Sequence, residues 1–237
     1  MYIMAEKQVK KRLVYYDTKT KNTSFLKTCN VLKNLGIKNY KFPLTLYDPK
    51  LMGVDPYDPN ISEEMKARVI IELRQNFWYF IREVVHIPVP GGFNVYGLHR
   101  GNLALSWCLV NNMNSIIELP RQNGKSISVC VFYLWLYNFA TVNSELMLMN
   151  KKFEDSRMNL RRIKEIRETL PPYLQFIDIN DKNNTEVLES AMNKNKLVAK
   201  SAASNEVAAD SLGRGCTQPC QWYDEIAFLK YNQVIYA

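Results

Sequence analysis

The 237-residue sequence predicts an α/β fold in which helices cover both faces of a mainly parallel β-sheet, preceded by a small helical appendage. Short apolar runs alternate with longer apolar or amphipathic segments, which is typical of strands and helices that follow one another in such a sheet. Residues 120–126 also have the composition of a tight turn between a strand and a helix. The apolar share of 47% is sufficient for a folded globular core.

Charge divides the chain into a basic N-terminal segment with a linker, residues 1–60, and a main domain, residues 61–237. Residues 1–42 contain ten Lys and Arg but only two acidic residues, Glu6 and Asp17, whereas the rest of the chain holds 21 of each sign. We expect this segment to contact DNA phosphates or an acidic partner, or to be a solvated surface.

The N-terminal segment is predicted to contain one short helix and a linker, and the main domain is predicted to begin with a second helix. Residues 23–35 carry apolar side chains at helical spacing and are followed by Gly36, which predicts a short amphipathic helix and its end. Three Asp-Pro pairs make residues 47–60 a turn-rich linker along the surface. Ser62 is predicted to cap a helix that runs to about Val85, because two glutamates follow it in the first turn.

The middle of the chain is predicted to enter the sheet. Residues 88–92 predict a loop or hairpin, and residues 103–110 predict a helix. Residues 115–119 contain three aliphatic side chains and predict a buried strand of a parallel sheet. The apolar residues 127–139 predict a helix buried beside it.

The downstream part continues the alternation of strands and helices. Residues 145–149 predict a strand, and residues 153–170 predict a helix that ends at the proline pair beginning with Pro171. The arginines of this helix are interpreted as a solvated face balanced by acidic residues. Further strands are predicted at residues 196–201 and 220–223.

Gly124, Lys125 and Ser126 have the composition of a phosphate-binding turn. The first backbone N–H groups of a helix lack partners within the helix and carry partial positive charge, so phosphate oxygens can satisfy them. Gly124 allows close approach of the backbone, Lys125 supplies charge for the β- and γ-phosphates of ATP, and Ser126 can bind Mg²⁺. The general pattern G-x-x-x-x-G-K-[ST] has glycine where this chain has Leu119. An ordinary turn with an exposed lysine is therefore the alternative.

Asp224 and Glu225 directly follow the predicted strand at residues 220–223. An aspartate at this point can hold Mg²⁺, and the adjacent glutamate can orient and deprotonate an attacking water. The alternative is an acidic pair that opens a surface helix, where carboxylates are favoured. Together with Lys125, the pair favours an ATP site that uses Mg²⁺.

Residues 120–126 read Pro-Arg-Gln-Asn-Gly-Lys-Ser, and this form of the loop resembles that of the large terminase subunit of tailed bacteriophages and herpes-like viruses. The resemblance covers about residues 62–237 and includes four further segments, 76–80, 91–93, 146–150 and 210–215. It implies the fold of P-loop ATPases of the RecA-like (ASCE) type. In that arrangement one strand separates the strand before the loop from the strand before Asp224.

The resemblance also implies roles for five further residues. Arg121, Gln122 and Asn123 would belong to the nucleotide-binding loop, with Arg121 close enough to the γ-phosphate to stabilise its charge. Arg214 would be an arginine finger, and a salt bridge or solvated surface is its alternative. Asn102 stands where terminases carry a glutamine that reads adenine, but it could equally be a helix N-cap.

A terminase large subunit hydrolyses ATP to drive double-stranded DNA into a procapsid, and the resemblance implies this motor activity. Glu225 would be the catalytic base. The implied partners are double-stranded DNA, the portal, the small terminase subunit and further copies in a ring, all in the host cytoplasm. The nuclease domain of the family has no counterpart here, so we expect no DNA cleavage. The sequence would be either an excised ATPase fragment or one product of a split gene whose partner chain carries that domain. The alternatives are a helicase-like ATPase and a non-catalytic fragment that binds DNA or the portal.

Two further classes of protein are disfavoured by the sequence. The longest apolar stretch, residues 127–140, is too short and too interrupted for a membrane span, so no membrane partner is expected. The five cysteines are irregularly spaced, which favours reduced thiols over a disulfide framework or a zinc site.

Overall fold

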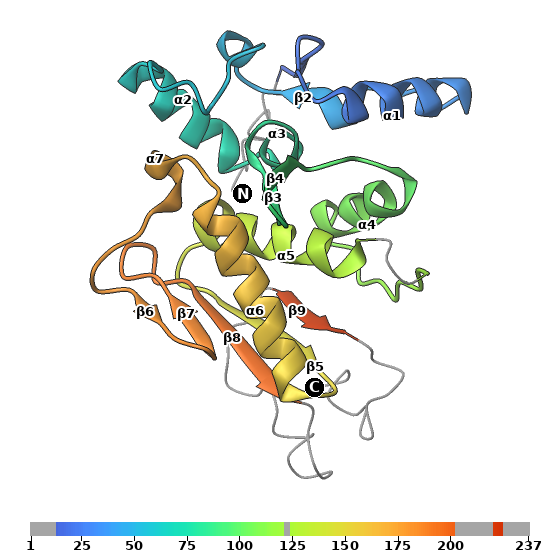
Figure 1. Cartoon of the computed structure of the whole chain (residues 1–237). Coiled ribbons are helices and arrows are strands. Elements are labelled where there is room, and N and C mark those ends of the chain that lie inside the picture. The colour runs from blue at the N-terminus through green and yellow to red at the C-terminus, as the bar shows by residue number, and fades with distance from the viewer. Residues whose placement is uncertain (1–12, 121–123, 202–219, 225–237) are drawn as a thin grey trace, which may run out of the picture.

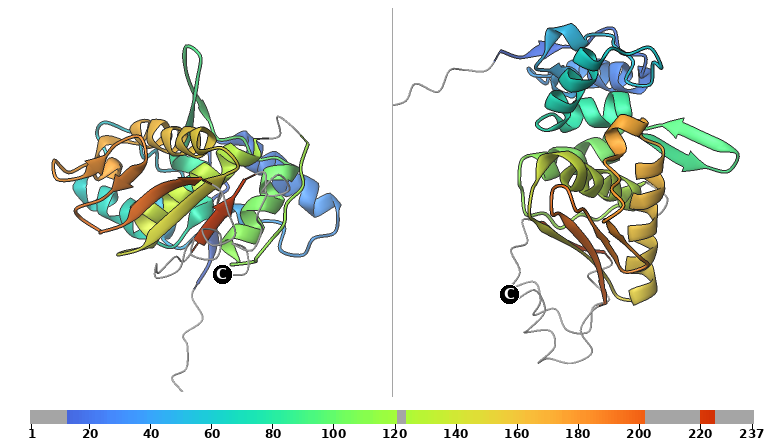
Figure 2. Two further views of the ribbon diagram at one scale, coloured as in Figure 1. Left: turned by 90° about the horizontal axis from the view of Figure 1, so that it is seen from below. Right: turned by 90° about the vertical axis from the view of Figure 1, so that its left-hand side faces the viewer.

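The computed structural model describes residues 13–120, 124–201 and 220–224. The chain forms an N-terminal lobe, residues 13–73, which lies at one end of the molecule and above a layer of helices (Figure 1). A five-stranded sheet with its covering helix lies at the other end (Figures 1 and 2).

The N-terminal lobe contains the helix predicted at residues 23–35 and the start of the helix predicted from Ser62. Gly36, with φ 77°, follows the first helix as predicted, and Ser62 Oγ accepts a hydrogen bond of 3.3 Å from the backbone of Met65 at the start of the second. The elements are β1 (Tyr15–Tyr16), α1 (Thr23–Asn34), β2 (Thr45–Leu46) and α2 (Glu63–Leu73), with 3₁₀ turns at Phe42–Leu44 and Pro49–Leu51.

The prediction of one helix from Ser62 to Val85 is wrong. Helix α2 ends at Leu73, and α3 (Phe77–Tyr79) begins after a break and continues as a π-helical turn, Phe80–Val84. The break lies at Asn76, whose Oδ1 accepts a hydrogen bond of 3.0 Å from the Tyr79 backbone and so caps a new helix.

The predicted hairpin is confirmed. Strands β3 (His86–Val89) and β4 (Gly92–Val95) pair antiparallel around Gly91, whose φ of 84° suits glycine. The hairpin projects from the body of the molecule (Figure 2). Helix α4 (Arg100–Val110) follows it, and α5 (Lys125–Trp135) continues into a π-helical turn, Leu136–Ala140.

The main sheet is mixed in direction. Its strand order is β6-β7-β8-β5-β9, in which β8, β5 and β9 are parallel while β6 and β7 are antiparallel to their neighbours. The elements are β5 (Glu145–Asn150), α6 (Phe153–Glu168), α7 (Pro172–Gln175), β6 (Lys182–Asn183), β7 (Val187–Glu189), β8 (Lys196–Ser201) and β9 (Cys220–Tyr223).

The predicted mainly parallel sheet with helices on both faces is therefore wrong. Small two-stranded sheets accompany the mixed one, and residues 115–119 form no strand. Ile116 is 92% exposed. Among the described strands β9 is at the edge of the sheet and pairs only with β5, and no described strand pairs with residues 115–119. An extended segment without a partner gains no inter-strand hydrogen bonds, which explains why its aliphatic composition did not produce a buried strand.

One continuous hydrophobic core runs from the N-terminal lobe through the helices α3 to α6 to one face of the main sheet. Leu146 and Leu148 of β5 belong to this core, whereas Met147 and Met149 pack with Tyr223 in a second, small cluster. Because alternate strand residues point to opposite faces, this division shows that α5 and α6 pack on the same face. Burial of both faces agrees with the nearly continuous apolar sequence of β5.

Candidate functional site

Gly124 lies immediately before α5 and begins the candidate site. Its φ of 67° and ψ of 15° are left-handed, a conformation that glycine adopts at little cost. The helix then starts at Lys125, and no acidic residue lies in its first turn. The first N–H groups of this eleven-residue helix and its dipole therefore provide a partly positive end.

Ser126 contacts a residue that is ninety-eight positions away in the sequence: its Oγ donates a hydrogen bond to Asp224 Oδ2 over 3.3 Å. Asp224 follows β9, and its backbone N–H donates to the Met149 carbonyl at 2.9 Å, which extends the pairing of β9 with β5. The sheet therefore places the carboxylate beside the first turn of α5. Across the described ranges, no carboxylate forms an ion pair with the neighbouring Lys125.

The Ser126 hydroxyl and the Asp224 carboxylate fit the donor chemistry of Mg²⁺. Both are hard oxygen ligands, and neighbouring oxygens around an octahedral Mg²⁺ are about 3 Å apart. The observed 3.3 Å separation is close to that value. These two residues could therefore hold the ion that the sequence predicted here.

A buried hydrogen-bond chain supports the start of α5. Tyr96 hydroxyl donates to Ser128 Oγ over 2.8 Å, and Ser128 Oγ donates to the Gly124 carbonyl over 2.9 Å. Tyr96 and Ser128 are almost fully buried. Sequence reasoning missed both residues, although a serine one turn after Gly124 in an otherwise apolar helix was a usable signal.

Helix α1 holds the segment that carries Tyr96. Asn22 Nδ2, just before α1, donates to the Tyr96 carbonyl over 2.9 Å, and Ser24 Oγ accepts from the Leu98 backbone at 2.9 Å. Thr28 donates to the Leu98 carbonyl over 3.2 Å. The N-terminal lobe is thus joined through residues 96–98 to the helix that follows the candidate phosphate loop.

Asn102 is engaged in a capping box at the start of α4. Its Oδ1 accepts from the His99 backbone at 2.8 Å and its Nδ2 donates to the Gly97 carbonyl at 2.8 Å, and the side chain is buried. His99 is the N-cap residue, and its Nδ1 accepts from the Gly101 backbone. This geometry favours the structural alternative for Asn102, because reading adenine would require breaking these bonds.

Five of the predicted site residues, Arg121, Gln122, Asn123, Arg214 and Glu225, lie outside the described residues, and their roles stay predictions. The structure brings Ser126 and Asp224 together, with Lys125 adjacent, and places Asn102 in a cap.

The cysteines near the site are protonated thiols. Burial raises the pKa of Cys130 to about 12, and burial also raises the pKa of Cys220. A thiol with such a pKa is a poor nucleophile at neutral pH. Cys29, Cys108, Cys130 and Cys220 form no disulfide. Nucleophilic thiol chemistry is therefore disfavoured at Cys130 and Cys220.

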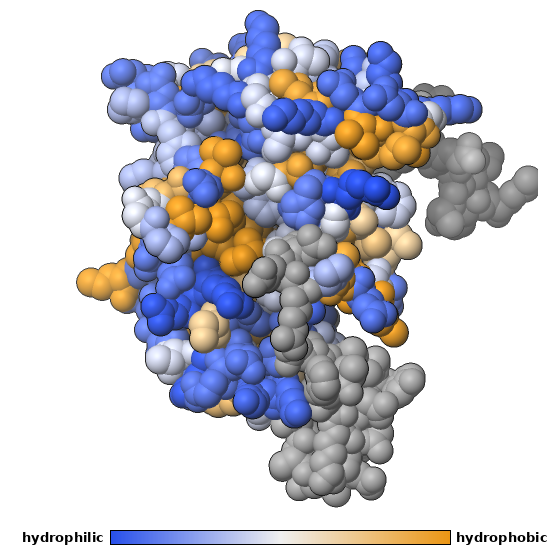
Figure 3. Space-filling model, turned by 45° about the vertical axis from the view of Figure 1, so that its right-hand side comes forward, coloured by the Kyte–Doolittle hydropathy of each residue, from blue (hydrophilic) through white to orange (hydrophobic). Residues whose placement is uncertain are grey.

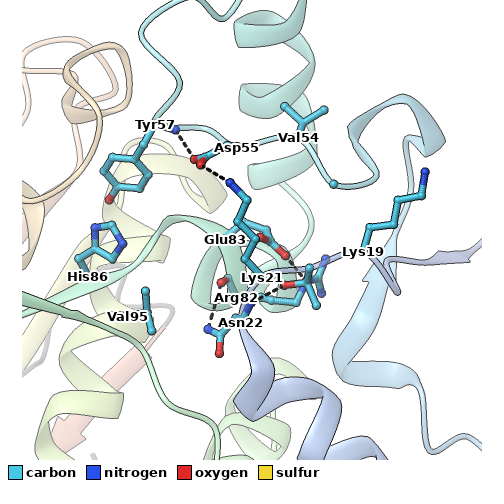
Figure 4. A pocket seen from close by; sticks show the side chains of 12 residues that line it. Lys19, Lys21, Asn22, Val54, Asp55, Tyr57, Arg82, Glu83, His86 and Val95 are labelled. Atoms are coloured by element: carbon cyan, nitrogen blue, oxygen red, sulfur yellow. Dashed lines mark hydrogen bonds and ion pairs between the residues drawn. The ribbon is translucent and has the colours of Figure 1, made fainter.

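A separate cavity of about 190 Å³ lies between the N-terminal lobe and β3 (Figure 4). Four of its charged groups form two ion pairs: Lys21 with Asp55 at 3.1 Å and Arg82 with Glu83 at 2.7 Å. Burial raises the pKa of Glu83, although the Arg82 guanidinium opposes this rise. Because these charges are already paired, we interpret the cavity as part of the contact between the N-terminal lobe and the β3–β4 hairpin.

The sequence matches no protein-family model and has no significant match among curated proteins. Within the described ranges, the helices are all too short or too polar to cross a membrane.

Proposed function

We propose that this chain binds and hydrolyses ATP with Mg²⁺ as the motor of a viral terminase large subunit, which packages double-stranded DNA in the host cytoplasm. The observation that carries the proposal is the hydrogen bond between Ser126 and Asp224, because two distant motifs predicted to share one ion come together. The left-handed Gly124 at the start of α5 adds support, as does Lys125, which forms no ion pair with a carboxylate in the described part of the chain.

Each residue has a defined task in this proposal. The N–H groups at the start of α5 and the Lys125 ammonium bind the phosphates, and Ser126 and Asp224 hold Mg²⁺. Bound Mg²⁺ neutralises charge on the β- and γ-phosphates. Glu225 takes the proton of the attacking water, and Arg121 stabilises the charge that develops on the γ-phosphate.

Arg214 of a neighbouring copy would complete the site, so hydrolysis would depend on ring assembly. The portal, the small subunit and a nuclease-bearing chain are the remaining proposed partners. The isolated chain should consequently bind ATP better than it hydrolyses it.

ATP binding and DNA-dependent hydrolysis by wild type, Lys125→Ala, Glu225→Gln and the exposed control Glu168→Gln test the proposal. We expect Lys125→Ala to lose binding, and Glu225→Gln to keep binding but lose about 10²- to 10⁴-fold in turnover, the range for a general base. The control should match wild type. Equal binding and rates in all four proteins would contradict the proposed activity.

A further inference from the structure

Residues 13–42 of the N-terminal lobe carry positive charges and no exposed acidic residue. Residues 13–42 include six lysines, and their one acidic residue, Asp17, is 1% exposed. The Asp17 carboxylate accepts hydrogen bonds from the backbone of Lys19 at 2.9 Å and of Gly53 at 3.3 Å. The Asp17 carboxylate therefore points into the lobe, and the solvent-accessible charges of residues 13–42 all belong to lysines.

Two of these lysines lie against tyrosine rings in what we call the lysine–tyrosine cluster, which consists of Lys33, Lys41, Tyr16 and Tyr40. The Lys33 ammonium is 5.8 Å from the centre of the Tyr40 ring. Lys41 is 5.8 Å from the same ring and 5.9 Å from that of Tyr16. Such contacts are worth about 0.5–1 kcal/mol at exposed sites, which restricts otherwise mobile side chains. Two ammonium groups are thus held at one ring.

Carboxylates neutralise other lysines but not this cluster. Lys21, Lys50 and Lys66 each have an acidic partner. In the part of the chain that the structure describes, neither Lys33 nor Lys41 has one. Fixed positive charges that lack a counter-charge favour a polyanion as the ligand.

The cluster belongs to the end of the molecule that is far from the sheet (Figure 1). On the face in Figure 3, hydrophilic side chains of the upper lobe border an apolar patch. Val31, Leu35 and Ile37 are exposed apolar side chains near the end of α1. Apolar side chains carry no charge that could neutralise the nearby lysines, so an anionic ligand remains the favoured partner.

We propose that the lysine–tyrosine cluster binds the phosphate backbone of double-stranded DNA. The choice of a duplex rests on the proposed packaging function, but the binding itself needs neither ATP nor the candidate phosphate loop. Two lysines that each replace a counterion at the duplex give affinity without sequence preference.

Fluorescence anisotropy of a labelled 30-base-pair duplex, titrated with the full chain without nucleotide at 50–200 mM KCl, tests this proposal. We expect Lys33→Ala and Lys41→Ala each to weaken binding and to lower the slope of log affinity against log salt by about one unit. Lys33→Arg should keep wild-type binding, because the charge remains. Lys182→Ala, on the exposed strand β6 at the other end of the molecule, is the matched control.

Wild-type affinity and salt slope in both alanine variants, with their folds intact by circular dichroism, would overturn the proposal and point to an acidic protein as the partner. Basal ATP binding should be unchanged in these variants. Loss of DNA binding can therefore be told apart from failure of the proposed ATPase activity.

Discussion

The Tyr96 hydroxyl lies 2.8 Å from Ser128 Oγ and connects two parts of the chain through one buried hydrogen bond. Tyr96 is held at its carbonyl by Asn22 of the N-terminal lobe. Ser128 in turn donates to the Gly124 carbonyl in the candidate phosphate loop. A single tyrosine therefore contacts the lobe through its backbone and supports the loop through its side chain.

Replacing Tyr96 with phenylalanine should lower the free energy of unfolding by about 1 kcal/mol, because the Ser128 hydroxyl loses a buried donor. Urea unfolding followed by circular dichroism measures this difference. Tyr15→Phe, at an exposed tyrosine, should have almost no effect. Similar stabilities of the two variants would show that the buried bond contributes little.

Replacing Ser126 with alanine should weaken nucleotide binding in the presence of Mg²⁺ about tenfold, or 1.4 kcal/mol, because one oxygen ligand of the ion is lost. Binding of a fluorescent ATP analogue, measured with Mg²⁺ and with EDTA, separates the contribution of the metal. Asp224→Asn should have the same signature, and Ser115→Ala, at an exposed serine upstream, should not. A loss that is equal with Mg²⁺ and with EDTA would contradict metal binding by Ser126.

Replacing Glu72 with glutamine should destabilise the N-terminal lobe by about 1.5–3 kcal/mol. The carboxylate is 1% exposed and accepts hydrogen bonds from the backbones of Tyr47 and Asp48 and from Asn76 Nδ2. A glutamine amide would turn a donor toward one of these donors. Thermal unfolding of this variant and of the exposed control Glu168→Gln measures the cost, and equal midpoints would argue against it.

His86 should make stability depend on pH. Burial lowers the pKa of His86 below its ordinary value of 6.5, although the charge of Asp55 opposes this shift. The His86 ring stacks on the Tyr57 ring, and the two ring centres are 4.4 Å apart (Figure 4). The neutral ring is favoured in the folded state. The contribution of neutral His86 to the free energy of unfolding is therefore complete above pH 6.5, and it is lost as the pH falls through the lowered pKa of the folded state.

Thermal midpoints of wild type and His86→Gln between pH 5 and pH 8 measure this dependence. The wild-type advantage at pH 8 should shrink toward pH 5. Two curves that stay parallel over this range would show that His86 does not titrate in the expected way.

The sequence predicted local structure well wherever one residue type decides it. Gly36 after α1, Ser62 before α2 and Gly91 in the hairpin have the geometries that their chemistry indicated. The helix break at Asn76 was missed because it depends on hydrogen bonds of the Asn76 side chain with Glu72 and with the Thr45 carbonyl of β2, which sequence spacing does not disclose.

Strand pairing was the weakest part of the prediction, because it depends on which segments lie beside one another. Residues 115–119 have an aliphatic composition but no described neighbour to pair with, and the antiparallel strands β6 and β7 were not predicted at all. In the candidate site, the motif residues Ser126 and Asp224 were found from spacing and chemistry. The supporting Tyr96 was not, since its role depends on a contact with Ser128, 32 positions away.

The attachment of α1 to residues 96–98 has a mechanical consequence for the proposed motor. Three hydrogen bonds, from or to Asn22, Ser24 and Thr28, hold this short segment. The Tyr96 hydroxyl then donates to Ser128, which donates to the Gly124 carbonyl. In the proposed motor, a duplex that pulls on the lobe would therefore act on residues 96–98 and, through Tyr96 and Ser128, on the Gly124 backbone before α5.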